Sequence, residues 1–470
     1  MKKTNILLYV LVIILFVGFC SSCYNAKKEN ASTPLPILAE KPPLGWNSWD
    51  CFAGDVNETQ VKQVADYMAD NLKEYGWEYV VIDGGWYRAP DSVAERRGHP
   101  CIDQYGRFMP DTIKFPSAIN GAGFKPLADY IHSKGLKFGI HIMRGVPRYA
   151  VKHEMKIWGT NFKANEIAEP TNVCGWSQSM FGINMTHPAG FAYYQSIAAL
   201  YDEWGVDYIK ADDMSSPYQV DEIEAISTAL KKSKRGIVLS LSPGGSNSVG
   251  AANHLRKNAH LWRISGDFWD TWEESLKKQF EICARWAPYV TENHWPDADM
   301  LPIGKLRKTG ADEWLVKNKL KANSSEEVTN EYSRLTKDEQ ITMMNLWAIF
   351  RSPLMIGGYL PENNDFTLSL ITNKELLELN QESINNKVVY QNEDKSIWTA
   401  DLKNGKYKYL AVFNISDGSM EEEIMVEQIG LENNKVYKFT DIWSKKQKSV
   451  SGKLSVHLKP HASMLYLVEI

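Results

Sequence analysis

Short apolar segments that alternate with longer amphipathic ones, from residue 44 to about residue 380, constrain the fold of this chain most. We predict strands at 44–49, 79–86, 137–143, 207–212, 236–242, 261–267, 289–294 and 353–359. The segments 58–75, 190–204 and 275–286 carry apolar residues at the helical period. Such alternation predicts a (β/α)8 barrel, an α/β fold. A doubly wound open sheet is the less favoured alternative, because no GxGxxG loop follows the first strand.

The pattern changes at about residue 388. Strand-like runs such as 397–400, 407–413 and 454–458 are separated by the turn-forming pairs Asn404-Gly405 and Asp417-Gly418. Short alternating runs with turn residues between them are typical of antiparallel sheets. We therefore predict a C-terminal antiparallel β-domain over residues 386–470, after a barrel over residues 41–385.

The first 40 residues are expected to lie outside the fold. Lys2 and Lys3 precede an apolar run at 6–19, which is typical of a secretory signal and too short for a membrane span. Ser21-Ser22-Cys23 resembles a bacterial lipobox, so residues 1–23 are predicted to be a signal peptide with Cys23 as the lipidated residue. Residues 24–40 are predicted to be a polar linker. The expected location is the periplasm or an outer-membrane anchor, with simple secretion as the alternative.

Cysteine count and charge limit the remaining possibilities. Cys51, Cys101, Cys174 and Cys283 allow three disulfide pairings, and the sequence does not choose among them. No two of these cysteines have CxxC spacing, so a zinc site is not expected. The net charge of −4 disfavours a nucleic-acid partner.

Two predicted strands end in an acid that has a basic residue close by. Asp212 comes two residues after Lys210, and Asp267 comes four residues after Arg263. Active sites of barrels lie at the C-terminal ends of the strands. The polar and aromatic residues predicted there are Trp49, Asp83, His141, Asp212, Ser242, Asp267 and Asp299. A pair of carboxylates is what glycosidic bond cleavage needs, since one attacks the sugar carbon and the other protonates the leaving oxygen.

Each of these residues also has a structural interpretation. An acid after the fourth strand can cap a helix, and Asp213 is the better candidate for that duty. Asp267 can form an ion pair with Arg263, which leaves Asp270 as the competing acid. The other open alternatives are Asp297 in place of Asp299 as the sugar ligand, a turn role for Asp83, core positions for Trp46 and Trp49, and hydrogen bonding within the site for His141.

Seven stretches, taken together and in order, resemble the melibiase-type α-galactosidases of glycoside hydrolase family 27. They are 44–49, 79–86, 135–140, 207–212, 296–301, 351–358 and 458–463. The resemblance implies a barrel followed by a β-sandwich, and retaining hydrolysis of terminal α-galactosides without a metal or organic cofactor. It implies that Asp212 is the nucleophile and Asp267 the general acid/base. Lys210 and Arg263 match sugar-binding bases, and Trp49, Asp83 and Asp299 match residues that line the sugar pocket.

Several positions depart from the family pattern and concern the substrate. The family usually has a second acid after the second strand, which holds O4 and O6 of galactose, and this chain has Gly84 there. Ser242 stands near a position where galactosidases commonly have a Glu that contacts the 2-hydroxyl. The loop at 142–148 carries Arg144 and Arg148, which are expected to meet either an acidic substrate or the loop's own carboxylates.

These departures leave room for α-N-acetylgalactosamine, β-L-arabinopyranose or α-glucan as substrates. A glycan-binding lipoprotein without catalysis is the alternative from another functional class.

Overall fold

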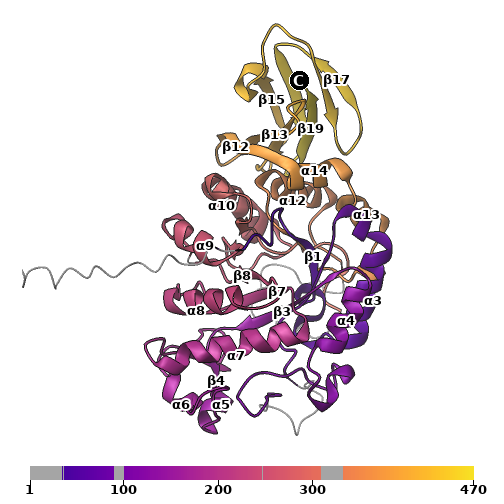
Figure 1. Cartoon of the computed structure of the whole chain (residues 1–470). Helices are drawn as coiled ribbons and strands as arrows, with labels where there is room; N and C mark the ends of the chain where they lie inside the picture. Colours follow the sequence, from indigo (N-terminus) through magenta and orange to yellow (C-terminus); the bar gives the residue numbers. More distant parts are fainter. Residues whose placement is uncertain (1–33, 35, 89–99, 246, 309–331) are drawn as a thin grey trace, which may run out of the picture. The chain divides into compact units, whose positions relative to one another are not determined.

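The computed structural model describes residues 34, 36–88, 100–245, 247–308 and 332–470 (Figure 1). The predicted signal peptide, Cys23 and most of the predicted linker lie outside the described residues. Among the residues that are described, no helix combines the length and the apolar character that crossing a membrane requires.

Eight parallel strands form the central sheet, in the order β10-β9-β8-β7-β3-β2-β1-β11. Their bounds are β1 (Leu44–Asn47), β2 (Tyr79–Ile82), β3 (Lys137–Met143), β7 (Tyr208–Asp212), β8 (Val238–Leu241), β9 (Leu261–Arg263), β10 (Trp295–Asp297) and β11 (Leu354–Ile356). The segment after β10 links the two edges of the sheet. The amide of Leu301 donates to the Met355 carbonyl at 2.7 Å, and Gly357 N donates to the Leu301 carbonyl at 2.9 Å. The predicted (β/α)8 barrel is confirmed.

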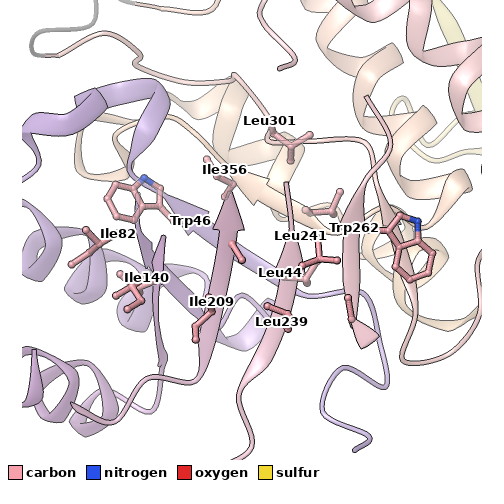
Figure 2. Packing of buried hydrophobic residues seen from close by; sticks show 14 of the residues in the cluster. Leu44, Trp46, Ile82, Ile140, Ile209, Leu239, Leu241, Trp262, Leu301 and Ile356 are labelled. Carbon is pink, nitrogen blue, oxygen red and sulfur yellow. The ribbon is translucent and has the colours of Figure 1, made fainter. Parts of the chain in front are cut away.

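The two faces of the sheet pack into different clusters, because successive side chains of a strand point to opposite faces. One face carries Ile82, Ile140, Ile209 and Leu239, which lie in the same cluster as buried helix residues (Figure 2). The other face encloses the barrel interior with Tyr79, Val81, Tyr208, Val238, Leu261, Trp295, Met300 and Met355. Both faces of a parallel barrel strand are thus buried, which explains the continuous apolar runs of the sequence.

Helices connect the strands and support the barrel (Figure 1). The helices of eight residues or more in the barrel region, with the shorter α9 and α13, are α3 (Glu58–Asn71), α4 (Lys125–Ser133), α7 (Pro188–Trp204), α8 (Val220–Lys231), α9 (Ala252–Asn258), α10 (Lys277–Trp286), α12 (Lys337–Phe350), α13 (Asp365–Ile371) and α14 (Lys374–Glu382). Helix α3 begins with a capping box. Gln60 N donates to Asn57 Oδ1 at 3.1 Å, and Asn57 N donates to Gln60 Oε1 at 3.0 Å.

The seventh strand differs from its prediction. We expected it at 289–294, but Tyr289 ends a 3₁₀ turn and β10 begins at Trp295. Thr291 and His294 instead bridge across a tight turn in which Asn293 has φ 65°. The strand itself contains one large apolar residue, Trp295, so its sequence lacks the usual signal of a buried strand.

An insertion follows β3 and returns the chain to α7. It contains α5 (Arg148–Lys152), α6 (Ala164–Ile167) and a small antiparallel sheet of β4 (Val146–Pro147), β5 (Ala168–Glu169) and β6 (Met180–Ile183). Strands of two to four residues are too short to leave a periodic pattern, and the sequence analysis did not find them.

The C-terminal region is antiparallel, as predicted. One sheet has the order β12-β13-β14-β19-β16-β17, and β15 pairs with β18. The bounds are β12 (Ser383–Gln391), β13 (Lys395–Leu402), β14 (Tyr407–Asn414), β15 (Met420–Met425), β16 (Tyr437–Asp441), β17 (Gln447–Val450), β18 (Lys453–Leu458) and β19 (Ser463–Glu469). Helix α12 contacts this region, since Thr342 Oγ1 donates to the His461 carbonyl at 2.8 Å.

Residues 36–39, which we call the N-terminal strap, were predicted to belong to a linker outside the fold, but they lie across the N-terminal ends of β9 and β10. Asn293 Oδ1 accepts hydrogen bonds from the amides of Leu38 and Ala39 at 3.0 Å. Trp295 Nε1 donates to the Ala39 carbonyl at 2.7 Å, and His260 Nε2 lies 3.0 Å from the Pro36 carbonyl. The strap therefore covers the end of the barrel opposite to the one where the predicted site residues lie.

No disulfide joins Cys51, Cys101, Cys174 and Cys283 to one another within the described parts of the chain. Cys51, Cys174 and Cys283 are buried, and Cys101 Sγ donates to Asp111 Oδ2 at 3.3 Å. Of the pairings that the sequence left open, the structure contains none.

Candidate active site

Asp83, the residue after β2, is held by groups from three directions. Its Oδ2 accepts hydrogen bonds from Asn47 Nδ2 and Lys210 Nζ, both at 2.8 Å. Its Oδ1 accepts from the amide of Gly84 at 2.7 Å. Burial acts to raise the pKa of Asp83, but the positive charge of Lys210 and the nearby His141 outweigh it and hold this pKa below its usual range. Asp83 is therefore a fixed carboxylate at the mouth of the barrel.

Asp212, the last residue of β7, has one well-bonded oxygen and one less engaged oxygen. Oδ1 accepts from Ser242 Oγ at 3.0 Å and from the Asp213 amide at 2.9 Å. Oδ2 lies 3.4 Å from His141 Nε2. Burial acts to raise the pKa of Asp212, but His141 and the charge of Lys210 lower it below the usual value. The carboxylate is thus ionised at neutral pH, and its side chain is 19% exposed.

Lys210 acts on two carboxylates of the site. Its positive charge lowers the pKa of Asp212, which lies two residues later on the same face of the strand. Its ammonium also contacts Asp83 directly, at 2.8 Å from Oδ2. Burial lowers the pKa of Lys210, but Asp83 and Asp299 raise it more, so the ammonium stays charged.

Arg263, the last residue of β9, joins two acids on the other side of the site. Its Nη2 lies 2.7 Å from Asp299 Oδ2 and 3.5 Å from Asp267 Oδ1. Asp299 also accepts from the Phe268 amide at 2.7 Å, and its own amide donates to Asp297 Oδ1 at 2.8 Å. Asp299, rather than Asp297, thus contacts the guanidinium, and it has an unusual left-handed φ of 86°.

Buried acids near Arg263 bind protons more tightly than free carboxyls do. Burial raises the pKa of Asp297 to about 6, with Asp299 adding to the rise and Arg263 opposing it. Burial also raises the pKa of Asp299 against the effect of Arg263. Asp50, which the sequence analysis missed, is fully buried, and burial together with the charge of Asp299 raises its pKa well above the usual value.

Asp267 is the solvent-facing acid of the set. Its side chain is 47% exposed, whereas that of the competing Asp270 has no exposed surface. Asp270 is bound by Arg307 and by Arg334, whose amide donates to Asp270 Oδ2 at 2.9 Å. Asp270 therefore belongs to a structural ion-pair cluster, and its carboxylate cannot reach a substrate. The loop that carries Asp267 is fixed on both sides, because Arg263 Nη2 donates to the Gly266 carbonyl at 2.5 Å and Phe268 N donates to Asp299.

Trp49, Gly84 and His141 converge beside Asp83. A Cβ atom on Gly84 would lie 3.4 Å from His141 Nδ1 and 3.8 Å from Trp49 Cζ3. Trp49 lies in the short helix α2 (Trp49–Phe52), not at the end of β1 as predicted, and it packs with Trp269, which the sequence analysis did not select. Trp46 is fully buried, and its Nε1 donates to the Gly358 carbonyl at 2.9 Å. The interpretation of Trp46 as a core residue is therefore confirmed.

A small cavity continues below these side chains into the barrel. It is lined by Asn47, Val81, Tyr208, Lys210, Ser240, Arg263, Asp297, Asp299, Met300 and Met355. In the described part of the chain, no group of three or more His, Cys, Asp or Glu side chains is arranged to hold a metal ion. The sequence analysis missed Asn47, whose only signal was its place at the end of the first strand.

Two expectations for the neighbouring loop were wrong. Asp213 does not cap α8, which begins after Gln219. Arg144 is buried and pairs with Asp213 and Glu222, so it meets neither a substrate nor acids of its own loop. Arg148 donates from Nε to the Met180 carbonyl at 3.1 Å and lies over the ring of Phe181.

Two family models match the chain. The model for α-galactosidase A matches residues 41–153 and 178–314, and the model for the α-galactosidase C-terminal β-sandwich domain matches residues 392–468. Among curated relatives, α-galactosidase 2 of Arabidopsis thaliana is 29% identical over 91% of this chain and 89% of its own length. The α-galactosidase of Cyamopsis tetragonoloba is 26% identical, covering 95% of this chain and 89% of that protein.

Solved structures agree with the family models. The family 27 β-L-arabinopyranosidase of Geobacillus stearothermophilus superposes with a TM-score of 0.85 at 42% identity, covering 92% of this chain and 97% of that one. A Bacillus halodurans protein assigned as an α-N-acetylgalactosaminidase gives a TM-score of 0.79 at 39% identity, with coverage of 93% and 99%. With two domain models matched in order and relatives matched along almost their whole length, the chain belongs to glycoside hydrolase family 27, the melibiase-type α-galactosidase family.

Proposed function

We propose that the protein is a retaining exo-glycosidase that releases terminal α-galactose from oligo- or polysaccharides. The observation that carries this proposal is the contrast between Asp212 and Asp267, two acids at the C-terminal ends of strands whose charges both act on Arg263. Asp212 is an ionised, well-oriented carboxylate. Asp267 is exposed, lies beside Arg263 and can exchange protons with water. A nucleophile and an acid/base of this kind are the two groups that retaining hydrolysis needs, with their carboxyls about 5–5.5 Å apart.

The first chemical step forms a bond from Asp212 to the sugar. Oδ1 of Asp212 is occupied by Ser242 and by the Asp213 amide, so Oδ2 is the oxygen that attacks the anomeric carbon. As the glycosidic bond breaks, protonated Asp267 gives its proton to the leaving oxygen, and the aglycone departs as an alcohol.

In the second step, the Asp267 carboxylate takes a proton from water. The water oxygen attacks the anomeric carbon, and the bond to Asp212 breaks with its electron pair returning to the carboxylate. Both acids are then in their starting protonation states.

The remaining polar groups are suited to hold the sugar hydroxyls. Asp83 with Lys210 forms one charged pair, and Asp299 with Arg263 forms another, on opposite sides of the pocket. Each pair is buried and oriented by backbone amides or Asn47, so its geometry is set before the sugar arrives. A site with buried hydrogen-bonding groups discriminates strongly against sugars that lack the matching hydroxyls, because the buried groups would then stay unpaired.

β-L-arabinopyranosides are the second candidate substrate. They share the ring stereochemistry of galactose but have no C6. The solved arabinopyranosidase at 42% identity supports this candidate. Gly84 supports it too, because the chain places one carboxylate, Asp83, where the family pattern has two.

Initial rates on nitrophenyl α-galactoside, α-N-acetylgalactosaminide, β-L-arabinopyranoside and α-glucoside test the proposal. The Asp212→Asn variant is the control, because it keeps the shape but removes the nucleophilic charge. We expect α-galactoside turnover that falls by about 10³-fold or more in the variant, or about 4 kcal/mol in the barrier. Turnover of another substrate in the wild type, also lost in the variant, would keep the mechanism and correct the glycone. Undiminished activity of the folded variant would disprove the role of Asp212.

We also propose that the protein is an exported lipoprotein, anchored through Cys23. The support is the charged start, the apolar run at 6–19 and the Ser21-Ser22-Cys23 motif. Metabolic labelling with a fatty-acid analogue, followed by membrane fractionation, tests this. Label and membrane association should disappear in Cys23→Ala, and an unlabelled wild-type protein in the medium would contradict the anchor.

A further inference from the structure

Arg144, directly after β3, is a buried cation that the proposed reaction does not use. Its side chain is 1% exposed. Nε donates to the Asp213 carbonyl at 2.9 Å and to Asp213 Oδ2 at 3.0 Å, and Nη2 lies 2.8 Å from the same Oδ2. One planar guanidinium thus binds both the backbone and the side chain of the residue that follows Asp212.

We call the contacts of the Arg144 guanidinium with Asp213 the clamp. Asp213 connects this clamp to Asp212. Its backbone has φ 62°, a left-handed conformation that is uncommon for a residue with a side chain. In this conformation its amide donates to Asp212 Oδ1 at 2.9 Å. The amide of Arg144 also donates to the Asp212 carbonyl at 3.0 Å. Arg144 therefore fixes the backbone on the C-terminal side of Asp212, at the Asp212 carbonyl and at Asp213.

A second set of contacts holds Arg144 from behind. Nη1 donates to Glu222 Oε1 at 2.5 Å, and Tyr194 Oη donates to Glu222 Oε2 at 2.6 Å. Tyr194 Oη in turn accepts from the Gly145 amide at 3.2 Å. Burial acts to lower the pKa of Arg144, but Glu222 and Asp213 raise it above its usual value. Helices α7 and α8 thus brace the guanidinium against the end of β7.

We propose that Arg144 is a positioning residue for the nucleophile, which holds the Asp213 amide in hydrogen-bonding range of Asp212 Oδ1 and leaves Oδ2 to attack. This rests on the proposed role of Asp212. A guanidinium suits the task because it presents several donors in one rigid plane, whereas an ammonium offers a point charge. Losing the amide donation would weaken the stabilisation of the charged form and shift the direction of the carboxylate.

Other groups also act on the Asp212 carboxylate and must stay constant in the test. They are His141 on β3, Asp83 after β2, Lys210 on β7, Ser242 after β8, Arg263 on β9, and Tyr87 and Cys174 from neighbouring loops. None of them is changed by a substitution at Arg144, so a shift in the acidic limb of kcat/KM reports the loss of the clamp.

The test compares Arg144→Lys with Arg351→Lys. Arg351 is a matched control, because its guanidinium also lies largely buried and donates to the carbonyls of Asn380, Gln381 and Ser383, far along the chain from the site. We expect Arg144→Lys to lower kcat by about 10–100-fold with little change in KM, since small misplacements of a reacting group cost about this much. The lower apparent pKa of the kcat/KM profile should rise. Arg351→Lys should lower the melting temperature and leave both kinetic readouts unchanged.

A folded Arg144→Lys enzyme with wild-type kcat and an unshifted acidic limb would overturn the proposal. If that variant fails to fold, Asp213→Asn decides the question, because Asn tolerates the left-handed conformation but loses the charge that Arg144 binds. A lowered kcat with little change in KM supports the proposal, and a wild-type kcat overturns it. Failure of the proposed function is seen separately, as full activity in Asp212→Asn.

Discussion

At the scale of single residues, the pocket separates its acids by what surrounds each of them. Asp83 and Asp212 lie near Lys210 and His141 and have lowered pKa values. Asp297 and Asp299 are dominated by burial and have raised ones. The same functional group therefore serves as a permanent anion on one side of the pocket and as a proton-retaining group on the other.

Gly84 is the residue at which we expect substrate preference to change. A Cβ atom there would meet no atom closer than 3.4 Å, so a side chain can begin at this position without displacing backbone. The new carboxylate would bind the exocyclic hydroxyl that galactose has and arabinopyranose lacks. We expect the ratio of kcat/KM for α-galactoside to that for β-L-arabinopyranoside to rise by about 10–100-fold. Gly84→Ala controls for volume, and equal ratios in the two variants would show that the carboxylate has no such role.

At the scale of elements, the strands with continuous apolar runs could be predicted and the polar ones could not. The range of β3 agreed residue by residue with its prediction, and the start of α3 at Glu58 was predicted as well. β10 was misplaced because its Trp-Pro-Asp sequence has almost no β pattern of its own, and its neighbours in the barrel determine its conformation.

The same limit applied to the site residues. Acids after apolar strands were recognisable, so Asp83, Asp212, Asp267 and Asp299 were selected. Which partner each one would bind depends on strand order, and a sequence does not reveal that Lys210 lies against Asp83 across β3. Arg144 was interpreted as a loop cation for the same reason, since its acids come from the residue after β7 and from α8.

At the scale of the whole molecule, the buried acids predict how stability changes with pH. The pKa of Asp297 rises from 3.8 to about 6 in the folded protein, so the folded state holds this proton more tightly than the unfolded state. Its contribution to stability is complete below about pH 4 and is lost as the pH rises to about 6, at a cost of about 3 kcal/mol. Asp83 and Asp212 act in the opposite direction, and their contribution is lost as the pH falls below about 4.

Thermal melts of the wild type and Asp297→Asn between about pH 4 and pH 8 measure this effect. The wild type should lose melting temperature from about pH 4 to 6. The variant keeps an oxygen that can accept from the Asp299 amide but has no charge to bury, so its curve should be flatter and higher at pH 8. Parallel curves for the two proteins would show that Asp297 does not control the change.

The position of the N-terminal strap determines which end of the barrel faces a support when the enzyme is immobilised through its N-terminus. Asn293, His260 and Trp295 bind residues 36–39 at the end of the barrel away from the pocket. A bead or surface coupled to the chain ahead of Pro36 would therefore be attached at the end of the barrel opposite to the active site. Immobilised in this way, the enzyme would present its open mouth to the surrounding solution, and bulky polysaccharides could reach it without passing the support.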